Sequence, residues 1–133
     1  MNLSFKNTLS EEEKVKVNEF YNSLKNVAVE QNLDWNEIVP SGKNCSYFYA
    51  SDNNRIQAFA IINEESFLGI VRYASIRFGP VFNEPDVLIE GIKEIIRHYR
   101  KKRYMHLSVL LPIIYITPIF RALMNGLNEL KNG

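Results

Sequence analysis

The sequence has little cysteine, little charge imbalance and no long apolar run, and each shortage excludes a class of protein. Cys45 is the only cysteine among 133 residues, so the chain cannot form an internal disulfide and is not a disulfide-stapled scaffold. A lone thiol fits a reducing compartment, and we expect a cytoplasmic protein. The formal net charge is +1. Proteins that bind nucleic acid by neutralising phosphates carry a basic surplus, so we do not expect a DNA-binding protein.

The apolar segments are too short to direct the chain into or across a membrane. The stretch Met1–Thr8 is polar and lacks the apolar core of a secretory signal. The most apolar stretch, Ser108–Phe120, contains Pro112 and Pro118 and is shorter than the roughly 20 residues that a spanning helix needs. We therefore expect no membrane span. The spacing of histidines, cysteines and carboxylates matches no metal site, and we expect neither a metal nor another cofactor.

What the sequence does contain is the balance of an ordinary globular domain. Hydrophobic residues make up 46% and charged residues 23% of the 133 residues, which is enough to bury one core. We predict a single domain over residues 1–133. Ser10 and Glu13 form the Ser-x-x-Glu pattern of a capping box, which begins a helix. Apolar residues at helical spacing follow, and they predict that this helix runs from Glu11 to Gln31.

Three strands are predicted after this helix. Aromatic and β-branched runs predict strands over Tyr47–Ala50, Arg55–Asn63 and Phe67–Phe78. The polar segments Ser51–Asn54 and Glu64–Ser66 separate them, and asparagine and aspartate suit the left-handed backbone of tight turns. Strands joined by such short turns form an antiparallel meander.

The second half of the chain predicts a crossover. Gly79-Pro80 ends the third strand because proline has no amide to donate, and Pro85 opens a second helix with an apolar stripe. The apolar run Met105–Leu111 predicts a fourth, buried central strand. A last helix begins at Ile113 or Pro118 and ends at Leu130. The order αβββαβα gives an α/β fold in which the fourth strand returns parallel to an earlier one.

This order of elements resembles the GNAT acyltransferase fold, and three short segments narrow the resemblance. Gln31–Trp35 is similar to the Gln-x-x-x-Trp element of Fem-type (FemABX) peptidoglycan aminoacyltransferases. Tyr49–Ala58 resembles their strand, polar turn and strand. Tyr73–Val81 resembles their Tyr-x-x-basic-Gly-Pro-Val element. A helix with a basic end and a strand ending in proline follow, so the resemblance covers about Phe20–Pro112.

The resemblance implies a substrate class and a set of contacts. Fem-type enzymes are similar to two GNAT-like domains in tandem, and they move an amino acid from aminoacyl-tRNA to a bacterial peptidoglycan precursor. The resemblance implies that this chain corresponds to the first of the two domains and is incomplete alone. Pairing with another chain, for instance as a homodimer, would then restore the two-domain cleft. No catalytic residue is assigned. The candidate substrate-binding residues are Trp35, Lys43, Tyr73, Arg77 and Gly79.

Two other functions remain open. One is a non-catalytic GNAT-like remnant or partner-binding module. The other is an acetyl-CoA-dependent N-acetyltransferase, whose pyrophosphate loop normally reads (Arg/Gln)-x-x-Gly-x-(Gly/Ala) and offers amides at a helix N-terminus. Arg77–Phe82 occupies that place, but Pro80 removes one amide and Phe82 crowds another. The pattern therefore argues against acetyl-CoA.

Several polar side chains have both a functional and a structural interpretation. Glu64, Glu65, Tyr73 and Tyr115 belong to an acyl-transfer cleft if one exists, since such a reaction needs a proton acceptor and donors. For Glu64 and Glu65 the pattern favours the solubilising of a hairpin turn. Trp35 either stacks on a substrate or anchors the core, and the second is favoured.

The histidines, the thiol and the basic run Arg97–Arg103 have less specific signals. The run either binds an anion, such as tRNA or a lipid pyrophosphate, or complements the helix dipole, which we favour. His98 lies inside this run and is expected to be solvated. His106 is expected to be buried in the central strand. Neither forms a cysteine-enzyme signature with Cys45, so we expect an inert thiol.

Overall fold

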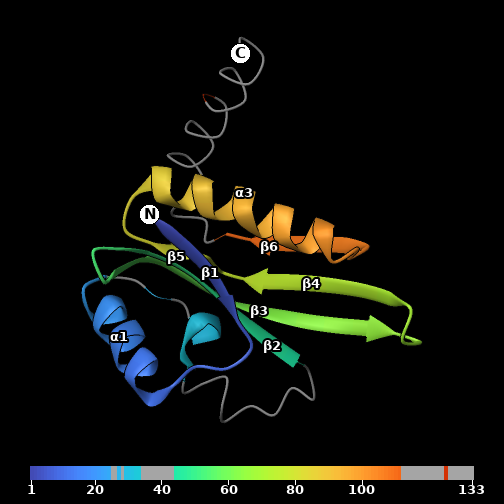
Figure 1. Cartoon of the computed structure of the whole chain (residues 1–133), viewed down its shortest axis with the longest axis horizontal. Coiled ribbons are helices and arrows are strands. Elements are labelled where there is room, and N and C mark those ends of the chain that lie inside the picture. The colour runs from blue at the N-terminus through green and yellow to red at the C-terminus, as the bar shows by residue number, and fades with distance from the viewer. Residues whose placement is uncertain (25–26, 28, 34–43, 112–124, 126–133) are drawn as a thin grey trace.

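The computed structural model describes residues 1–24, 27, 29–33, 44–111 and 125. These residues form a mixed six-stranded sheet with α1 on one face and α3 on the other (Figure 1). The elements are β1 (Asn2–Lys6), α1 (Glu11–Asn22), the 3-10 turn η1 (Val29–Gln31), β2 (Asn44–Asp52), β3 (Arg55–Phe67), β4 (Val71–Arg77), β5 (Val81–Phe82), α3 (Pro85–Lys101) and β6 (His106–Leu110).

The sheet contains the predicted meander and parallel return, together with two strands, β1 and β5, that were not predicted. Its strand order is β1-β2-β3-β4-β6, and β5 pairs with β3 beyond the end of β4. The pairs β1–β2, β2–β3 and β3–β4 are antiparallel, whereas β6 lies parallel to β4. The α/β class, the antiparallel meander and the parallel return after α3 are therefore confirmed. The turn at Asn53 and Asn54 is also confirmed, since both residues have positive φ angles of 50° and 63°.

The N-terminal half differs from the prediction in two places. The polar stretch before the first helix contains a strand, β1, in which Leu3 and Phe5 alternate with polar residues and pack on the core. Helix α1 begins at the predicted capping box but ends at Asn22, so the prediction that it reaches Gln31 is wrong. At the end of the helix the Ser23 hydroxyl donates to the Phe20 carbonyl at 2.6 Å, which gives one of the last carbonyl groups a partner.

The turn between β3 and β4 lies further along the chain than predicted. Glu64 to Ser66 belong to β3, and the turn follows at Leu68 and Gly69, with φ angles of 55° and 67°. The predicted turn position is therefore wrong, and so is the interpretation of Glu64 and Glu65 as turn residues. The physical reason is local. Both carboxylates are held on the sheet by hydrogen bonds, and Gly69 adopts the left-handed backbone that the turn needs.

Strand β6 is at the edge of the described sheet and is not the buried central strand that its apolar run predicted. Leu107 and Val109 pack toward α3, while His106, Ser108 and Leu110 are exposed. A half-buried edge strand needs only alternate apolar residues, which this run also satisfies. The expectation that His106 is buried is wrong for the same reason. The last predicted helix, except residue 125, lies outside the described residues.

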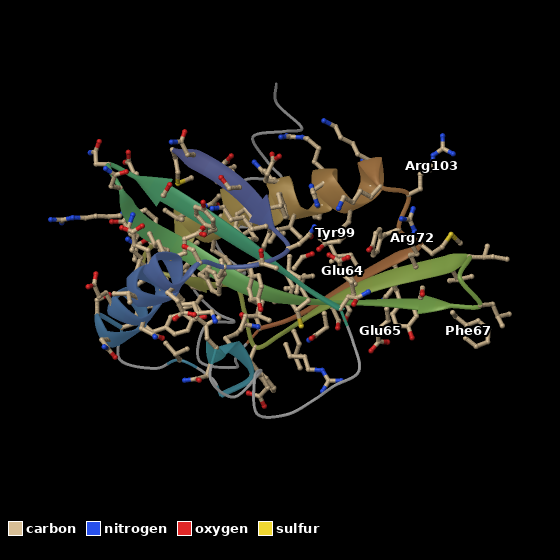
Figure 2. All side chains as sticks on the ribbon, turned by 60° about the horizontal axis from the view of Figure 1, so that its bottom comes forward. Glu64, Glu65, Phe67, Arg72, Tyr99 and Arg103 are labelled. Carbon is tan, nitrogen blue, oxygen red and sulfur yellow. The ribbon has the colours of Figure 1, made fainter. Side chains whose placement is uncertain are left out.

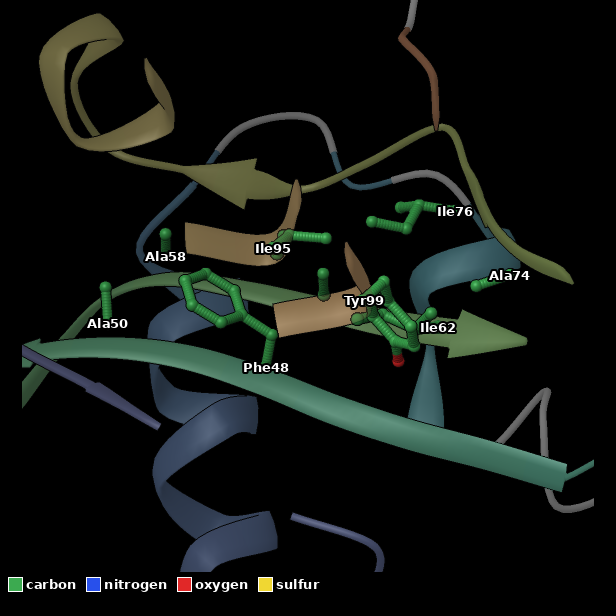
Figure 3. Close-up of a cluster of buried hydrophobic side chains, with 9 residues drawn as sticks. Phe48, Ala50, Ala58, Ile62, Ala74, Ile76, Ile95 and Tyr99 are labelled. Carbon is green, nitrogen blue, oxygen red and sulfur yellow. The ribbon is translucent and has the colours of Figure 1, made fainter. Parts of the chain in front are cut away.

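The core has one cluster on each face of the sheet. The cluster under α3 combines small strand residues with larger ones, so the helix approaches the strands closely (Figure 3). Its buried members are Phe48, Ala50, Ala58, Ala60, Ile62, Ala74, Ile76, Ile95 and Tyr99. The cluster under α1 has the buried members Val17, Phe20, Tyr21, Leu33, Phe59, Ile61 and Val81. Within the described part of the chain, no helix is long and apolar enough to span a bilayer.

Candidate functional site

Beyond the end of α1, the sheet presents a patch of polar side chains that we call the polar face. Phe59 and Ile61 of β3 pack against α1, and side chains two residues apart on a strand share a face. Asn63 and Glu65 therefore continue that face past the helix. The residues paired with Asn63 and Glu65 on the neighbouring strands β2 and β4, and the partners of the β4 residues on β6, extend this face sideways. The polar face consists of one row with Cys45, Asn63, Ser75 and Ser108, and a second row with Glu65, Tyr73 and His106.

The second row brings together three groups that can move protons. Glu65 and Tyr73 are directly paired on β3 and β4, and Tyr73 is paired with His106 on β6. The Tyr73 hydroxyl donates a hydrogen bond to the Glu65 carboxylate, and this bond, with smaller effects of burial and charge, raises the pKa of Tyr73. The phenol thus remains a proton donor at neutral pH, beside a carboxylate that can accept a proton. This arrangement can serve general acid–base chemistry.

The first row holds neutral donors and acceptors. The Cys45 thiol donates to the Asn63 side-chain oxygen at 3.4 Å. Burial, together with the charge of Glu64, raises the pKa of Cys45, which disfavours the thiolate. The thiol therefore lacks the activation of a nucleophile, consistent with the expected inert role. Asn63 and Ser75 are paired across β3 and β4 and supply polar groups next to Glu65 and Tyr73.

Glu64 lies on the opposite face of β3 and has a different environment (Figure 2). Its carboxylate accepts hydrogen bonds from the hydroxyls of Tyr99, at 2.8 Å, and Tyr104, at 2.7 Å. Burial by itself raises the pKa of Glu64, but the hydrogen bonds from Ser46, Tyr104 and Tyr99 and the charge of Lys102 outweigh it and lower the pKa. Glu64 therefore ties the end of α3 to the sheet.

Gln31 closes the gap between β3 and the end of β4. Its side-chain oxygen accepts from the Ile61 amide at 2.8 Å, and its side-chain nitrogen donates to the carbonyls of Arg77, at 2.9 Å, and Ile61, at 3.4 Å. A Cβ atom on Gly79 would lie 2.8 Å from Gln31 Cδ. Because Gly79 lacks that atom, the chain after β4 fits directly beneath the Gln31 side chain.

The connection from β4 to α3 offers few amides to an anion. Pro80 and Pro85 have no N–H group, and the Asn83 amide donates to the Gln57 carbonyl at 3.1 Å. At the start of α3, Glu84 and Asp86 place two carboxyl groups beside the positive end of the helix dipole. This connection is therefore poorly suited to a pyrophosphate.

The structure brings together some of the residues predicted from the sequence and separates others. Tyr73 and Arg77 lie on the same face of β4, and the Arg77 side chain is exposed. Gly79 is buried against the Gln31 side chain. Trp35, Lys43 and Tyr115 lie outside the described residues. Among the described residues, no group of three histidine, cysteine or acidic side chains could hold a metal ion.

Three members of the polar face, Asn63, Ser75 and Ser108, were not predicted from the sequence, and His106 was wrongly expected to be buried. The signal for them was present as period-two alternation in β3, β4 and β6. The turn predicted at Glu64–Ser66 interrupted that alternation, so the pairing of Glu65 with Tyr73 could not be predicted. His98 was also misplaced. Its ring stacks on Phe5 at 3.6 Å between centroids, and burial lowers its pKa, with the charge of Lys102 adding to the effect.

Comparisons with known proteins identify the fold. No family model and no curated protein matches the sequence. A ribosomal-protein-alanine N-acetyltransferase from Brucella melitensis biovar Abortus 2308 matches with a TM-score of 0.63 at 10% identity, over 96% of this chain and 91% of its own. An aminoglycoside acetyltransferase from an uncultured soil metagenomic sample, in complex with trehalose, matches with a TM-score of 0.60 at 15% identity, over 91% of this chain and 85% of its own. The same acetyltransferase in complex with sisomicin matches with a TM-score of 0.59 at 12% identity, over 92% of this chain and 85% of its own.

The chain therefore has the GNAT-like fold of acyltransferases. At identities of 10–15% this likeness establishes the fold and leaves the reaction to be argued from the site.

Proposed function

We propose that the polar face is the acyl-transfer site of an aminoacyltransferase related to the Fem type. The donor is an aminoacyl-tRNA ester, and the acceptor is an amine on a peptidoglycan precursor. The observation that carries the reaction type is the Tyr73–Glu65 hydrogen bond, which places a proton donor and a proton acceptor side by side on a GNAT-like sheet. The Fem-like segments around Gln31 and Gly79 support the choice of substrates.

The proposed reaction moves one proton through this pair. The acceptor amine attacks the ester carbonyl, a C–N bond forms, and Glu65 takes the proton that the nitrogen loses. The ester C–O bond then breaks, and Tyr73 gives its proton to the departing ribose oxygen. Transfer of the proton from Glu65 to Tyr73 along their hydrogen bond restores the starting state. Asn63 and Ser75, paired beside them, are the side chains suited to bind the polar parts of the substrates.

The geometry of the β4–α3 connection supports an ester donor over acetyl-CoA. A bound coenzyme A would place its pyrophosphate near amides at the start of α3, where Pro80 and Pro85 lack N–H groups and Glu84 and Asp86 repel anions. An aminoacyl ester needs no pyrophosphate site. In this proposal Arg77, exposed at the end of β4, and Lys43 contact the tRNA backbone, and Trp35 contacts the precursor.

A second candidate is an acetyl-CoA-dependent N-acetyltransferase. The observation in its favour is that the structural neighbours are themselves acetyltransferases. The same Glu65–Tyr73 pair would then act on an amine and a thioester. A non-catalytic GNAT-like module is the remaining possibility, and pairing with a second copy or another chain belongs to the proposal, because Fem-type enzymes resemble two such domains.

Donor choice separates these functions. The full chain is incubated with a muropeptide acceptor and with either isotope-labelled aminoacyl-tRNA or labelled acetyl-CoA, and labelled product is separated by chromatography. We expect transfer from the aminoacyl-tRNA alone, lost in Glu65→Gln and kept in Glu12→Gln, a matched change on the exposed start of α1. Transfer from acetyl-CoA would instead establish the second candidate. Absence of transfer, with no thermal stabilisation by either substrate, would leave the non-catalytic module.

A further inference from the structure

The turn between β3 and β4 exposes a contiguous group of large apolar side chains, which we call the apolar tip. Phe67 is 62% exposed, Leu68 79%, Ile70 82% and Val71 38%. Met105, 72% exposed, lies beside them on the other face of the sheet, because its amide donates to the Arg72 carbonyl at 2.8 Å and it lies two residues before Leu107, which packs under α3. Single exposed apolar residues are common on soluble proteins, but four within the five residues of one turn mark an interaction surface.

Four exposed cations border the apolar tip and form what we call the basic cluster. They are Arg72, Lys101, Lys102 and Arg103. The Arg72 guanidinium donates to the Lys102 carbonyl and lies 5.0 Å from the centre of the Tyr104 ring, so β4 and the end of α3 are held together. The β3–β4 turn and the end of α3 lie at the same end of the molecule (Figure 1), and Phe67, Arg72 and Arg103 lie toward that end (Figure 2).

The charge of the basic cluster is not matched by neighbouring carboxylates in the sequence. Neither Ser66–Arg72 nor Ile95–His106 contains an acidic residue. Further back on α3, by contrast, Lys93 and Arg97 are paired with Glu90 and Glu94. Among the described residues, Glu64 interacts with the charge of Lys102 but also accepts from two tyrosines, and Glu65 accepts from Tyr73.

We propose that the apolar tip and the basic cluster dock this protein on an anionic lipid membrane. The apolar tip inserts at the boundary between headgroups and acyl chains, and the basic cluster contacts the negatively charged headgroups. Both halves of this surface match the two forces that hold peripheral proteins on anionic bilayers, the burial of apolar side chains and the attraction of cations. The inference does not depend on the proposed acyl transfer.

The composition of the surface favours a membrane over RNA or a second copy of the chain. Single-stranded RNA is bound by cations together with aromatic rings that stack on bases, whereas the two most exposed residues of the tip, Leu68 and Ile70, are aliphatic. Two copies that met at their tips would bring both basic clusters together, and like charges repel.

Vesicle co-sedimentation with the full chain tests the proposal. The vesicles contain either phosphatidylcholine alone or phosphatidylcholine with phosphatidylglycerol. The tip variant is Leu68→Asn with Ile70→Thr, where asparagine suits the positive φ of residue 68. The charge variant is Lys101→Gln with Arg103→Asn, chosen because residue 103 also has a positive φ of 59°. Matched controls are Val15→Thr, an exposed apolar position on α1, and Lys16→Gln with Arg55→Gln.

We expect the wild-type chain to bind the anionic vesicles, more weakly at high salt and weakly to neutral vesicles. Each variant should lower the partition coefficient about tenfold, and the controls should stay within about twofold of wild type. Three results would overturn the proposal: no wild-type binding to anionic vesicles, equal binding by the tip variant, or a change of oligomeric mass in the tip variant by light scattering. Binding to RNA that needs the basic cluster, without binding to vesicles, would assign the surface to RNA instead.

Discussion

The Gln31 side chain takes the place of a strand neighbour for Ile61. It accepts from the Ile61 amide at 2.8 Å and donates to the Ile61 carbonyl at 3.4 Å, in the interval of β3 between its pairing with β4 and its pairing with β5. The side-chain nitrogen of Gln31 also donates to the Arg77 carbonyl at 2.9 Å. Gln31 is only 1% exposed, so water cannot reach the backbone groups of Ile61 and Arg77 to take its place as their hydrogen-bond partner.

The first prediction concerns this buried amide. Gln31→Met keeps most of the volume of the side chain but leaves the Ile61 amide and two carbonyls unpaired, so the free energy of unfolding should fall by about 2–4 kcal/mol. Urea denaturation followed by circular dichroism measures the change. Asn22→Ala, at the exposed end of α1, is the control and should alter the free energy by less than about 0.5 kcal/mol. A Gln31→Met protein as stable as the control would refute the role of the amide.

The second prediction tests the fit between Gly79 and Gln31. In Gly79→Ala the new Cβ would lie 2.8 Å from Gln31 Cδ, so the substitution should cost about 1–3 kcal/mol by overpacking. Combining it with Gln31→Ala removes the clashing group. The cost of the alanine at 79 should therefore shrink in the double variant, which a double-mutant cycle of urea denaturation measures. Additive costs would mean that the two residues do not interact.

The fold could be predicted from the sequence largely because its signals are local. The capping box at Ser10 and Glu13, the asparagines at the β2–β3 turn and Pro85 at the start of α3 each specify an element boundary within a few residues. The parallel return of β6 then follows from the crossover helix. Strand β1 was missed because Leu3 and Phe5 provide too few alternations to identify a strand without its partner β2.

The candidate site was less predictable because it depends on register. Tyr73 and Glu65 were both singled out from the sequence, but their contact requires β3 to run through residue 67. A turn misplaced by a few residues changes which side chains face each other. Gln31 is a stronger example. Its bonds to Ile61 and Arg77 join residues 30 and 46 positions apart, and no local pattern encodes such contacts.

The third prediction concerns Tyr21, a buried residue of α1 that packs toward the sheet. Its hydroxyl has no hydrogen-bond partner among the described residues, and burial raises its pKa. Tyr21→Phe removes an unsatisfied polar atom and should leave the free energy of unfolding unchanged or raise it by about 1 kcal/mol. Tyr99→Phe is the matched comparison, since it loses the 2.8 Å hydrogen bond to Glu64 and should be destabilising. A loss of stability in Tyr21→Phe would indicate a bonding partner for its hydroxyl.

The fourth prediction is a pH dependence that arises from Glu64. Its folded-state pKa lies below the ordinary value of 4.5, so the carboxylate contributes stability above about pH 4.5 and loses it as the pH falls through the folded-state value. Urea denaturation between pH 7 and pH 3 should show a steeper loss for wild type than for Glu64→Gln. Glu13, whose pKa is also lowered, chiefly by its bond with Lys6, is common to both proteins and cancels in the difference. Parallel curves would count against this role.

The last prediction separates the two tyrosine–carboxylate pairs on opposite faces of the sheet. Tyr73→Phe removes the proton donor of the polar face, and in the aminoacyl-transfer assay it should lower kcat by about 10²–10⁴ while changing the free energy of unfolding by less than about 1 kcal/mol. Tyr104→Phe is its counterpart, since Tyr104 donates to Glu64 at 2.7 Å on the α3 face. That variant should lose stability and keep its kcat. Because both substitutions delete one hydroxyl bound to a glutamate, equal effects on kcat would mean that the polar face has no special part in the reaction.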